Sequence, residues 1–220
     1  MKKYFYLLAA GLLLLCTGRA QIKKGESLLG GSVGFMRQDY NAISPGNGNA
    51  TYVNVQPSFG KAIKDNLVVG VNLYYSYSKL VEPSDATPIY TVKQPGYGLG
   101  FFVRGYKDLG RSFSMFLEGD LGGMYSLAKG SYEGVNELSV DNKGYSINAS
   151  LSAGIAYHIT PRWMVETGFQ NLAYINYGHT KYGGTITSVG GRQKESSFSL
   201  GTNLNKELNN FAIGCRYILN

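Results

Sequence analysis

Large apolar residues recur at every second position in eight separate stretches of this chain. In the clearest stretch, Tyr145–Tyr157, aromatic and aliphatic residues alternate with Ser, Asn and Gly over most of its length. Successive side chains of a β-strand point to opposite faces of a sheet, so this period predicts strands with one apolar and one polar face. The predicted strands are Leu28–Arg37, Thr51–Gly60, Leu67–Tyr77, Tyr97–Tyr106, Phe113–Tyr125, Tyr145–Tyr157, Trp163–Tyr177 and Phe211–Leu219.

Two places interrupt the alternation. The seventh strand loses its register near Asn171, which predicts a β-bulge there. The segment Ser196–Leu204 also alternates, and the pattern allows two interpretations. It is either the upper end of the eighth strand or a separate small hairpin.

The connections between the strands fall into two classes that alternate along the chain. Short turns follow strands two, four and six, and longer polar loops follow strands one, three, five and seven. The turns are Lys61–Asn66, Lys107–Arg111 and Ile159–Arg162; the loops lie near Tyr40–Ala50, Lys79–Val92, Lys129–Lys143 and Gly178–Ser196. Short turns on one side and long loops on the other are typical of outer-membrane barrels, with both termini on the short-turn side. We therefore expect an all-β fold, an eight-stranded antiparallel up-and-down transmembrane β-barrel.

The first 20 residues predict export. Lys2 and Lys3 precede a continuous apolar run from Tyr4 to Leu15, and Gly18-Arg19-Ala20 supplies the small residues of a cleavage site. These are the parts of a secretory signal peptide. We expect residues 1–20 to be removed and residues 21–220 to form one barrel domain.

Composition and charge narrow the function. The chain has 30 Gly, 18 Tyr and 10 Phe, which suits narrow, aromatic-rich strands. Cleavage would remove three basic residues and lower the formal net charge from +7 to +4. No basic run is interleaved with aromatic residues, so nucleic-acid binding is not expected. The mature chain would keep one cysteine, Cys215, which excludes an intramolecular disulfide.

Aromatic residues gather near both ends of the predicted strands. Phe59, Phe113, Tyr157, Trp163 and Tyr217 lie near the short turns; Tyr74, Tyr75, Tyr77, Tyr125, Tyr174 and Tyr177 lie near the long loops. Rings with an apolar body and a polar tip form girdles at the two membrane interfaces, and we interpret both sets in this way. The other interpretation is that they form the core of a soluble barrel.

Five charged residues fall on the predicted inner face of the barrel: Arg104, Glu118, Asp120, Glu166 and Arg216. Charges in a narrow interior must be paired or hydrated, and an eight-stranded barrel has room for side chains and little else. We therefore expect a lumen charge network that acts as a plug. A transport path through the lumen is the alternative.

The sequence contains few candidate residues for catalysis or for binding a metal or cofactor. The two histidines, His158 and His179, have no carboxylates grouped with them, so no metal site is expected. His179 is the only candidate general base. The Gly96-x-Gly98-x-Gly100 run lies within a strand, with no helix after it, so it is not a nucleotide-binding loop. We expect no catalytic residue, no cofactor-binding residue and no cofactor.

Several segments resemble a known class of proteins. These are Gly18-Arg19-Ala20-Gln21, the Trp163–Phe169 strand and the C-terminal segments Phe198-Ser-Leu-Gly and Asn210–Tyr217. They look like the small outer-membrane β-barrel proteins of Bacteroidota-type bacteria, which are similar in architecture to the barrel domains of OmpA and OmpX. The family usually ends on an aromatic residue, whereas this chain ends Leu219-Asn220. The resemblance implies insertion by the barrel-assembly machinery.

The expected function is that of a non-enzymatic integral protein of the cell outer membrane, with a structural or surface-interaction role. Its partners would be outer-membrane lipid and lipopolysaccharide, together with an extracellular ligand that the sequence does not identify. Three alternatives remain open: a small-molecule conduit, a lipid A-modifying enzyme and a secreted lipocalin-like barrel. A lipocalin-like cavity would need an apolar interior, whereas the inward residues here are Ser, Asn, Gly and charged residues.

Overall fold

Every regular element in the described part of the computed structural model is a β-strand. The structure describes residues 21–41, 47–82, 90–110, 112–132, 135–183, 194–202 and 211–219. Its strands are β1 (Ser27–Asn41), β2 (Asn47–Lys64), β3 (Leu67–Glu82), β4 (Tyr90–Gly110), β5 (Phe113–Tyr132), β6 (Val135–His158), β7 (Trp163–Lys181), β8 (Lys194–Thr202) and β9 (Phe211–Leu219). Across these ranges, no helix has the length and apolarity needed to cross a membrane.

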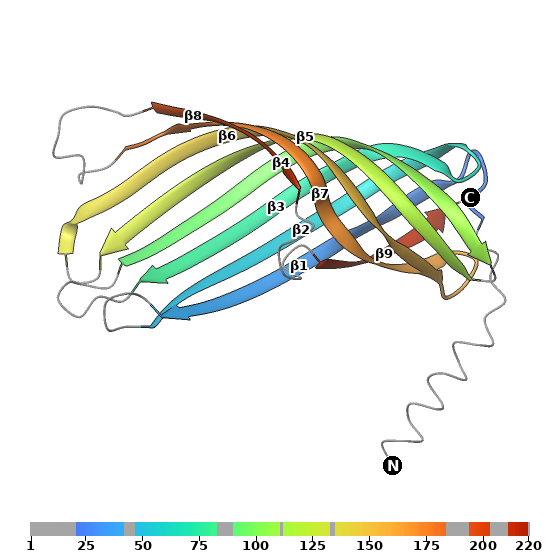
Figure 1. Ribbon diagram of the computed structural model, residues 1–220, viewed down its shortest axis with the longest axis horizontal. Helices are drawn as coiled ribbons and strands as arrows, with labels where there is room; N and C mark the ends of the chain where they lie inside the picture. The colour runs from blue at the N-terminus through green and yellow to red at the C-terminus, as the bar shows by residue number, and fades with distance from the viewer. Residues whose placement is uncertain are drawn as a thin grey trace, which may run out of the picture.

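The strands close into a ring of eight (Figure 1). Strands β1 to β7 each pair antiparallel with the next, and β9 lies between β7 and β1. Ser27 pairs with Leu219, so the first and last strands meet at the end of the barrel that carries the short turns. The predicted eight-stranded antiparallel barrel is confirmed, and so is the placement of both strand termini at its short-turn end.

The eighth position in the wall is shared by β8 and β9. Thr202 at the end of β8 pairs with Ala173 on β7, and Phe211 at the start of β9 pairs with Phe169 on the same strand. The two segments therefore follow one another down the same edge of β7. Of the two interpretations of Ser196–Leu204, its described part supports the upper end of strand eight; Leu204 itself lies outside the described residues.

This split leaves β1 paired unequally along its length. Its ladder with β9 ends at Val33, whereas its ladder with β2 continues to Asn41. In the described part of the chain, the segment 34–41 is hydrogen-bonded on one side only.

The predicted bulge lies on β7. The register with β6 shifts between Leu151, which faces Ala173, and Ala153, which faces Phe169. Asn171, inside this interval, has a φ of 54°, in the left-handed region that Asn tolerates better than most residues. Three residues of β7 oppose one of β6 in this interval, so the two extra residues keep even-numbered side chains pointing inward, and Tyr174 and Asn176 line the lumen as Gln170 does.

The two faces of the wall follow the predicted alternation. The outward residues Phe101, Leu117 and Leu151 are 63%, 58% and 47% exposed, whereas their inward neighbours Phe102 and Glu118 are 2% and 4% exposed. The exposed outer positions form a belt of large apolar side chains around the barrel. Its members include Leu29, Val33, Leu73, Leu99, Phe101, Leu117, Leu121, Ile147, Leu151, Ile155 and Ile213.

The strands extend further on the long-loop side than the sequence predicts. The segment Lys129–Lys143, expected as a loop, is mostly a paired hairpin in which Lys129 faces Asp141 and Tyr132 faces Val135. Backbone hydrogen bonds continue a ladder where no face needs to be apolar, so hydrophobic alternation did not reveal these ends.

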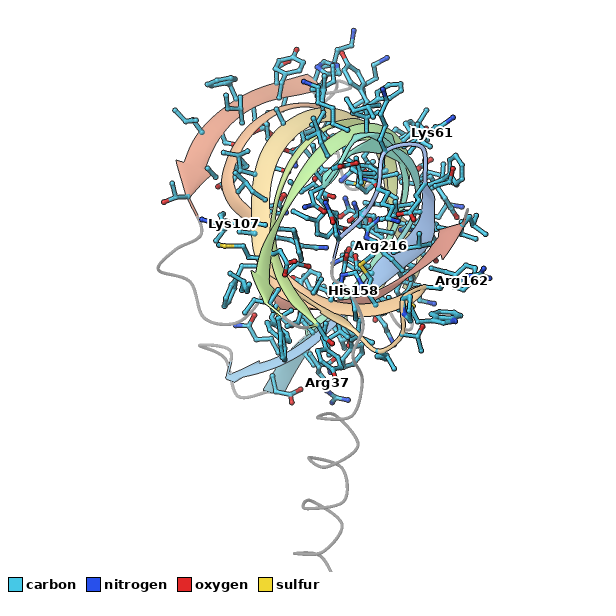
Figure 2. The ribbon with its side chains drawn as sticks, turned by 90° about the vertical axis from the view of Figure 1, so that its right-hand side faces the viewer. Arg37, Lys61, Lys107, His158, Arg162 and Arg216 are labelled. Carbon is cyan, nitrogen blue, oxygen red and sulfur yellow. The ribbon has the colours of Figure 1, made fainter. Side chains whose placement is uncertain are left out.

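The short-turn end of the barrel is closed by an apolar base. Leu28, Val68, Met164 and Ile218 are buried there, and Ile22 joins them from the segment that precedes β1. The backbone N–H of Ile22 donates to Asn66 Oδ1 at 3.0 Å, which ties this segment to the β2–β3 turn. Figure 2 looks into this end, with His158 and Arg216 inside the ring and Lys61, Lys107 and Arg162 at its rim.

Candidate functional site: the lumen

A layer of buried charge lies directly above the apolar base. Arg104 on β4 forms an ion pair with Glu118 on β5, and Arg216 on β9 forms one with Glu166 on β7. Both pairs join the neighbouring strands on which the sequence places them. All four side chains are at most 7% exposed.

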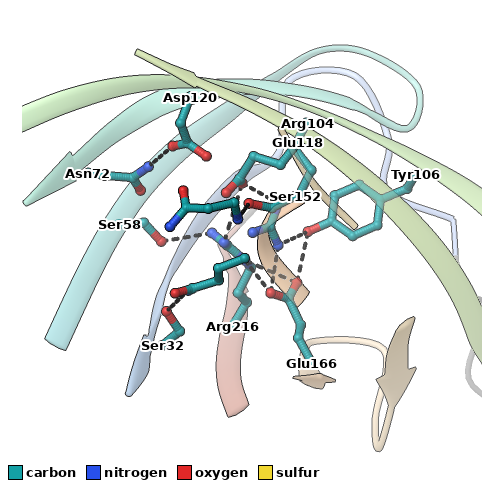
Figure 3. A network of polar contacts seen from close by, with 12 residues as sticks. Ser32, Ser58, Asn72, Arg104, Tyr106, Glu118, Asp120, Ser152, Glu166 and Arg216 are labelled. Atoms are coloured by element: carbon teal, nitrogen blue, oxygen red, sulfur yellow. Dashed lines mark hydrogen bonds and ion pairs between the residues drawn. The ribbon is translucent and has the colours of Figure 1, made fainter. Parts of the chain in front are cut away.

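A third contact joins the two pairs across the barrel (Figure 3). Arg104 Nη1 lies 2.6 Å from Glu166 Oε2, so one carboxylate serves both guanidinium groups. The phenol of Tyr106 donates to Glu166 Oε1 at 3.0 Å, and Arg216 Nη1 donates to Ser58 Oγ at 2.7 Å. Two positive and two negative groups thus form a neutral network that spans the lumen.

Aromatic rings support the arginines from the base. The Arg104 guanidinium carbon lies 4.3 Å from the centroid of Phe116, and that of Arg216 lies 5.6 Å from Phe102. A guanidinium group is weakly hydrated and stacks well on aromatic faces, which suits it to a dry position above an apolar layer.

Asp120, the fifth predicted member of the network, lies outside it. Asn72 Nδ2 donates to Asp120 Oδ1 at 2.6 Å, and the Tyr74 hydroxyl lies 3.4 Å from the same oxygen. In the described part of the chain, Asp120 forms no ion pair. Its inward position is as expected, but its partners are neutral because it lies one step above the arginines, toward the long-loop end.

The network separates two cavities of different size. Around the charged groups, only about 40 Å³ is free, enough for an ordered water molecule. Above them, the lumen widens to about 490 Å³, within the range of small-molecule sites. We call this space the outer cavity. Its polar lining includes Asn54, Gln56, Tyr74, Ser76, Asp120, Asn148, Ser150, Gln170, Tyr174 and Asn176.

Glycines make room for Tyr74 in the outer cavity. A Cβ at Gly100 would lie 2.5 Å from the Tyr74 hydroxyl, and one at Gly122 would lie 2.9 Å from its ring. The ring therefore fills a recess that only glycine leaves open. The prediction that Tyr74 and Tyr174 belong to the outer girdle is wrong, since both line the lumen. The other predicted girdle residues on this side include Tyr75, Tyr125 and Tyr177, which are exposed.

A histidine and a serine meet at the long-loop end. His179 Nδ1 lies 2.9 Å from Ser196 Oγ, across the register of β7 and β8. Glu195, the neighbour of Ser196, accepts a hydrogen bond from the Tyr182 hydroxyl at 2.6 Å. The pairing depends on β8 lying beside β7, so spacing along the sequence did not indicate it.

The structure brings no metal ligands together in its described ranges, where no three His, Cys, Asp or Glu side chains form a possible metal site. His158 is fully buried in the base, and within the described ranges neither of its ring nitrogens has a hydrogen-bond partner. Cys215 is an exposed free thiol on the outer face of β9.

Several lumen residues were missed by the sequence analysis. Ser58, Asn72 and Tyr106 complete the hydrogen bonding of the charged groups, but each is one polar residue among many on an inward face. Their signal was the inward register itself. The expected charges show only which strands carry ions, not which neutral groups those ions select.

Comparisons with known proteins add little. No protein-family model matches the sequence, and no curated protein matches it. Among solved structures, the crystal structure of Neisserial surface protein A matches 90% of this chain and 99% of its own, with 13% sequence identity and a TM-score of 0.35. The barrel architecture therefore rests on the strand pairing of this chain.

Proposed function

We propose that this protein is a non-enzymatic integral β-barrel of the bacterial outer membrane with a structural or surface-interaction role. The single observation that carries the proposal is the apolar belt. Large side chains such as Phe101 and Leu117 cover the outside of a closed barrel whose inside is polar and charged. A water-soluble barrel would have the opposite arrangement, whereas lipid around the wall stabilises this one.

Paired aromatic side chains support the same orientation. At the short-turn end, Trp163 packs on Tyr217 with ring centroids 4.9 Å apart, and Phe113 packs on Tyr157 at 4.8 Å. At the other end, Tyr75 packs on Tyr97 at 5.4 Å. Rings at both borders of an apolar belt are typical of a barrel in a bilayer.

The proposal includes the route and the partners. We expect residues 1–20 to act as a cleaved export signal, and the barrel-assembly machinery to insert the chain among outer-membrane lipid and lipopolysaccharide. The resemblance to small Bacteroidota-type barrels of the OmpA and OmpX kind points the same way. Short turns would then face the periplasm, and the paired hairpins would face the exterior.

Orientation is tested by cysteine labelling on intact cells, in a Cys215→Ser background. Ser131 is exposed on the long hairpin of β5 and β6, and Arg162 is exposed in the β6–β7 turn. A membrane-impermeant maleimide should label Ser131→Cys on intact cells and Arg162→Cys only after the outer membrane is opened. Recovery of the protein in the soluble fraction without detergent would refute membrane insertion.

A lipid-modifying enzyme is the second candidate, favoured by the contact between His179 and Ser196. A nucleophilic serine needs a base within hydrogen-bond reach, and these two side chains meet that condition. In the described chain, however, no carboxylate hydrogen-bonds His179, and Glu195 is engaged by Tyr182. We therefore expect a fluorophosphonate probe not to modify the purified barrel. Labelling that disappears in Ser196→Ala would establish the enzyme instead.

A small-molecule conduit is the third candidate. It is favoured by the one-sided pairing of the segment 34–41, which leaves an edge in the upper wall. The charge network opposes passage through the barrel axis. Conductance measurements in planar bilayers distinguish a conduit from a barrel whose lumen is plugged.

A further inference from the structure

The outer cavity has an uneven charge. Of the described residues that line it, only Glu118 and Asp120 carry a full charge, and both are acidic. Glu118 is neutralised by Arg104 in the layer below. Asp120 lies beside Glu118 on the inner face; in the described chain it hydrogen-bonds to the neutral Asn72 and Tyr74, and no cation forms an ion pair with it.

The same wall also has an unsatisfied acceptor. Asn148 lines the outer cavity, and its Oδ1 atom is buried with no hydrogen-bond partner among the described residues. In the register of β5 and β6, Asp120 faces Ser150, so Asn148 lies one inward step above it. A buried acceptor without a donor is costly, and two acceptors so close together favour a ligand with several N–H groups.

Two aromatic rings complete the site. Tyr74 and Tyr174 both line the outer cavity, and Tyr74 is held in its glycine recess beside Asp120. An aromatic face attracts a cation, and a carboxylate forms stronger hydrogen bonds with a charged donor than with a neutral one. The surrounding Asn, Gln and Ser side chains suit hydroxyl or amide groups on the rest of the ligand.

We propose that the outer cavity is a binding site for a small, hydroxyl-rich molecule that carries an ammonium group. The ammonium would donate to Asp120 and Asn148, and the hydroxyl groups would meet the polar wall. An ammonium has three donors and no acceptor, which complements these two acceptors. The volume of about 490 Å³ accommodates a molecule the size of a sugar.

Three probes with one ring skeleton test the charge preference: glucosamine with its amine protonated, glucose and glucuronate. The readout is NMR of ¹³C-methyl-labelled methionines in the purified, detergent-solubilised barrel. Met124 lines the outer cavity, whereas Met115 is 45% exposed on the outer face. Glucosamine should shift the Met124 signal but not that of Met115. It should bind about tenfold more tightly than glucose, and glucuronate should bind more weakly than either.

Two variants locate the site. Asp120→Asn keeps the side-chain shape but removes the charge, and should lower the glucosamine affinity to that of glucose. Its matched control is Asp141→Asn, an exposed carboxylate outside the cavity, which should bind as the parent does. Ser150→Lys places a tethered ammonium opposite Asp120 and should block glucosamine binding. Heat-modifiable gel migration verifies that each variant has folded.

Three results would contradict a site for an ammonium-bearing ligand in the outer cavity. Equal affinity for the three probes, a glucosamine affinity unchanged in both Asp120→Asn and Ser150→Lys, or no response of Met124 to any probe would overturn the proposal. Because the readout uses purified barrel, these results are independent of the cellular location proposed above.

Discussion

Arg216 binds Glu166 through a single nitrogen: its Nε lies 3.0 Å and 2.9 Å from the two carboxylate oxygens. The guanidinium nitrogens that remain reach elsewhere, with Nη1 on Ser58. Glu166 therefore has room to accept from Arg104 and Tyr106 as well. Four hydrogen bonds from three donor groups converge on this one carboxylate, which makes it the centre of the lumen network.

Removing the charge of Glu166 should destabilise the barrel strongly. Glu166→Gln leaves two buried guanidinium groups with one carboxylate between them, and we expect a loss of about 3–5 kcal/mol in the free energy of unfolding. Urea unfolding in lipid vesicles, followed by the fluorescence of Trp163, the single tryptophan, measures it. Asp141→Asn is the control and should change stability little. A stability of Glu166→Gln equal to the parent would show that the network is hydrated rather than buried.

The outer and inner faces should respond differently to a new charge. Leu151 lies on the apolar belt of β6, midway between the outward-facing Tyr145 and Tyr157 at the borders of the belt, so Leu151→Arg should cost about 2–4 kcal/mol in a bilayer. Ser146 on the same strand lines the outer cavity, and Ser146→Lys should cost less than about 1 kcal/mol. Refolding yield into vesicles and urea midpoints compare the two. Similar losses would contradict the assignment of lipid and lumen faces.

Close packing against its two neighbouring strands should make Gly70 intolerant of a side chain. A Cβ there would collide with the backbone oxygen of Phe59 and lie 2.5 Å from the Phe102 ring. Gly70→Ala should therefore cost about 1–3 kcal/mol through overpacking. Gly105 on the adjacent strand has nothing within 4 Å of the same position, so Gly105→Ala should be neutral or slightly stabilising. Equal stability of both variants would mean that the wall moves apart at little cost.

The charge network should block ions. In planar bilayers, the parent protein should show no steady conductance, because only about 40 Å³ is free around the network. Arg104→Ala removes the side chain that joins both carboxylates and should open a small leak. Large, stable channels from the parent protein would instead favour the conduit.

The sequence predicted the strands and faces of the barrel wall better than the side-chain contacts inside the lumen. Hydrophobic alternation assigns Leu151 to the outside and Ser152 to the inside because the period of a strand is fixed, and the bulge at Asn171 appears as a break in that period. The split of the eighth strand was harder. Ser196–Leu204 alternates in either interpretation, and only its pairing with β7 decides between them.

Inside the lumen, the sequence identified the ions and the two pairs on neighbouring strands, but not the contact that joins the pairs. Arg104 and Glu118 are partners because their strands are neighbours, which the short turn between them predicts. The contact of Arg104 with Glu166 crosses the barrel, and no separation along the chain encodes it. Tyr74 was assigned to the wrong face because its neighbours Tyr75 and Tyr77 are also aromatic. The residue type alone therefore did not show which of these tyrosines points into the lumen.

The ladder that joins β1 to β9 ends at Val33, much earlier than the one that joins β1 to β2. It also connects residues near opposite ends of the sequence, so it closes the largest loop in the chain at the greatest entropic cost. The hairpins of the meander can form locally before it. We therefore expect ring closure to be the last event of folding. We also expect the short β1–β9 ladder to be the first to separate when the barrel unfolds.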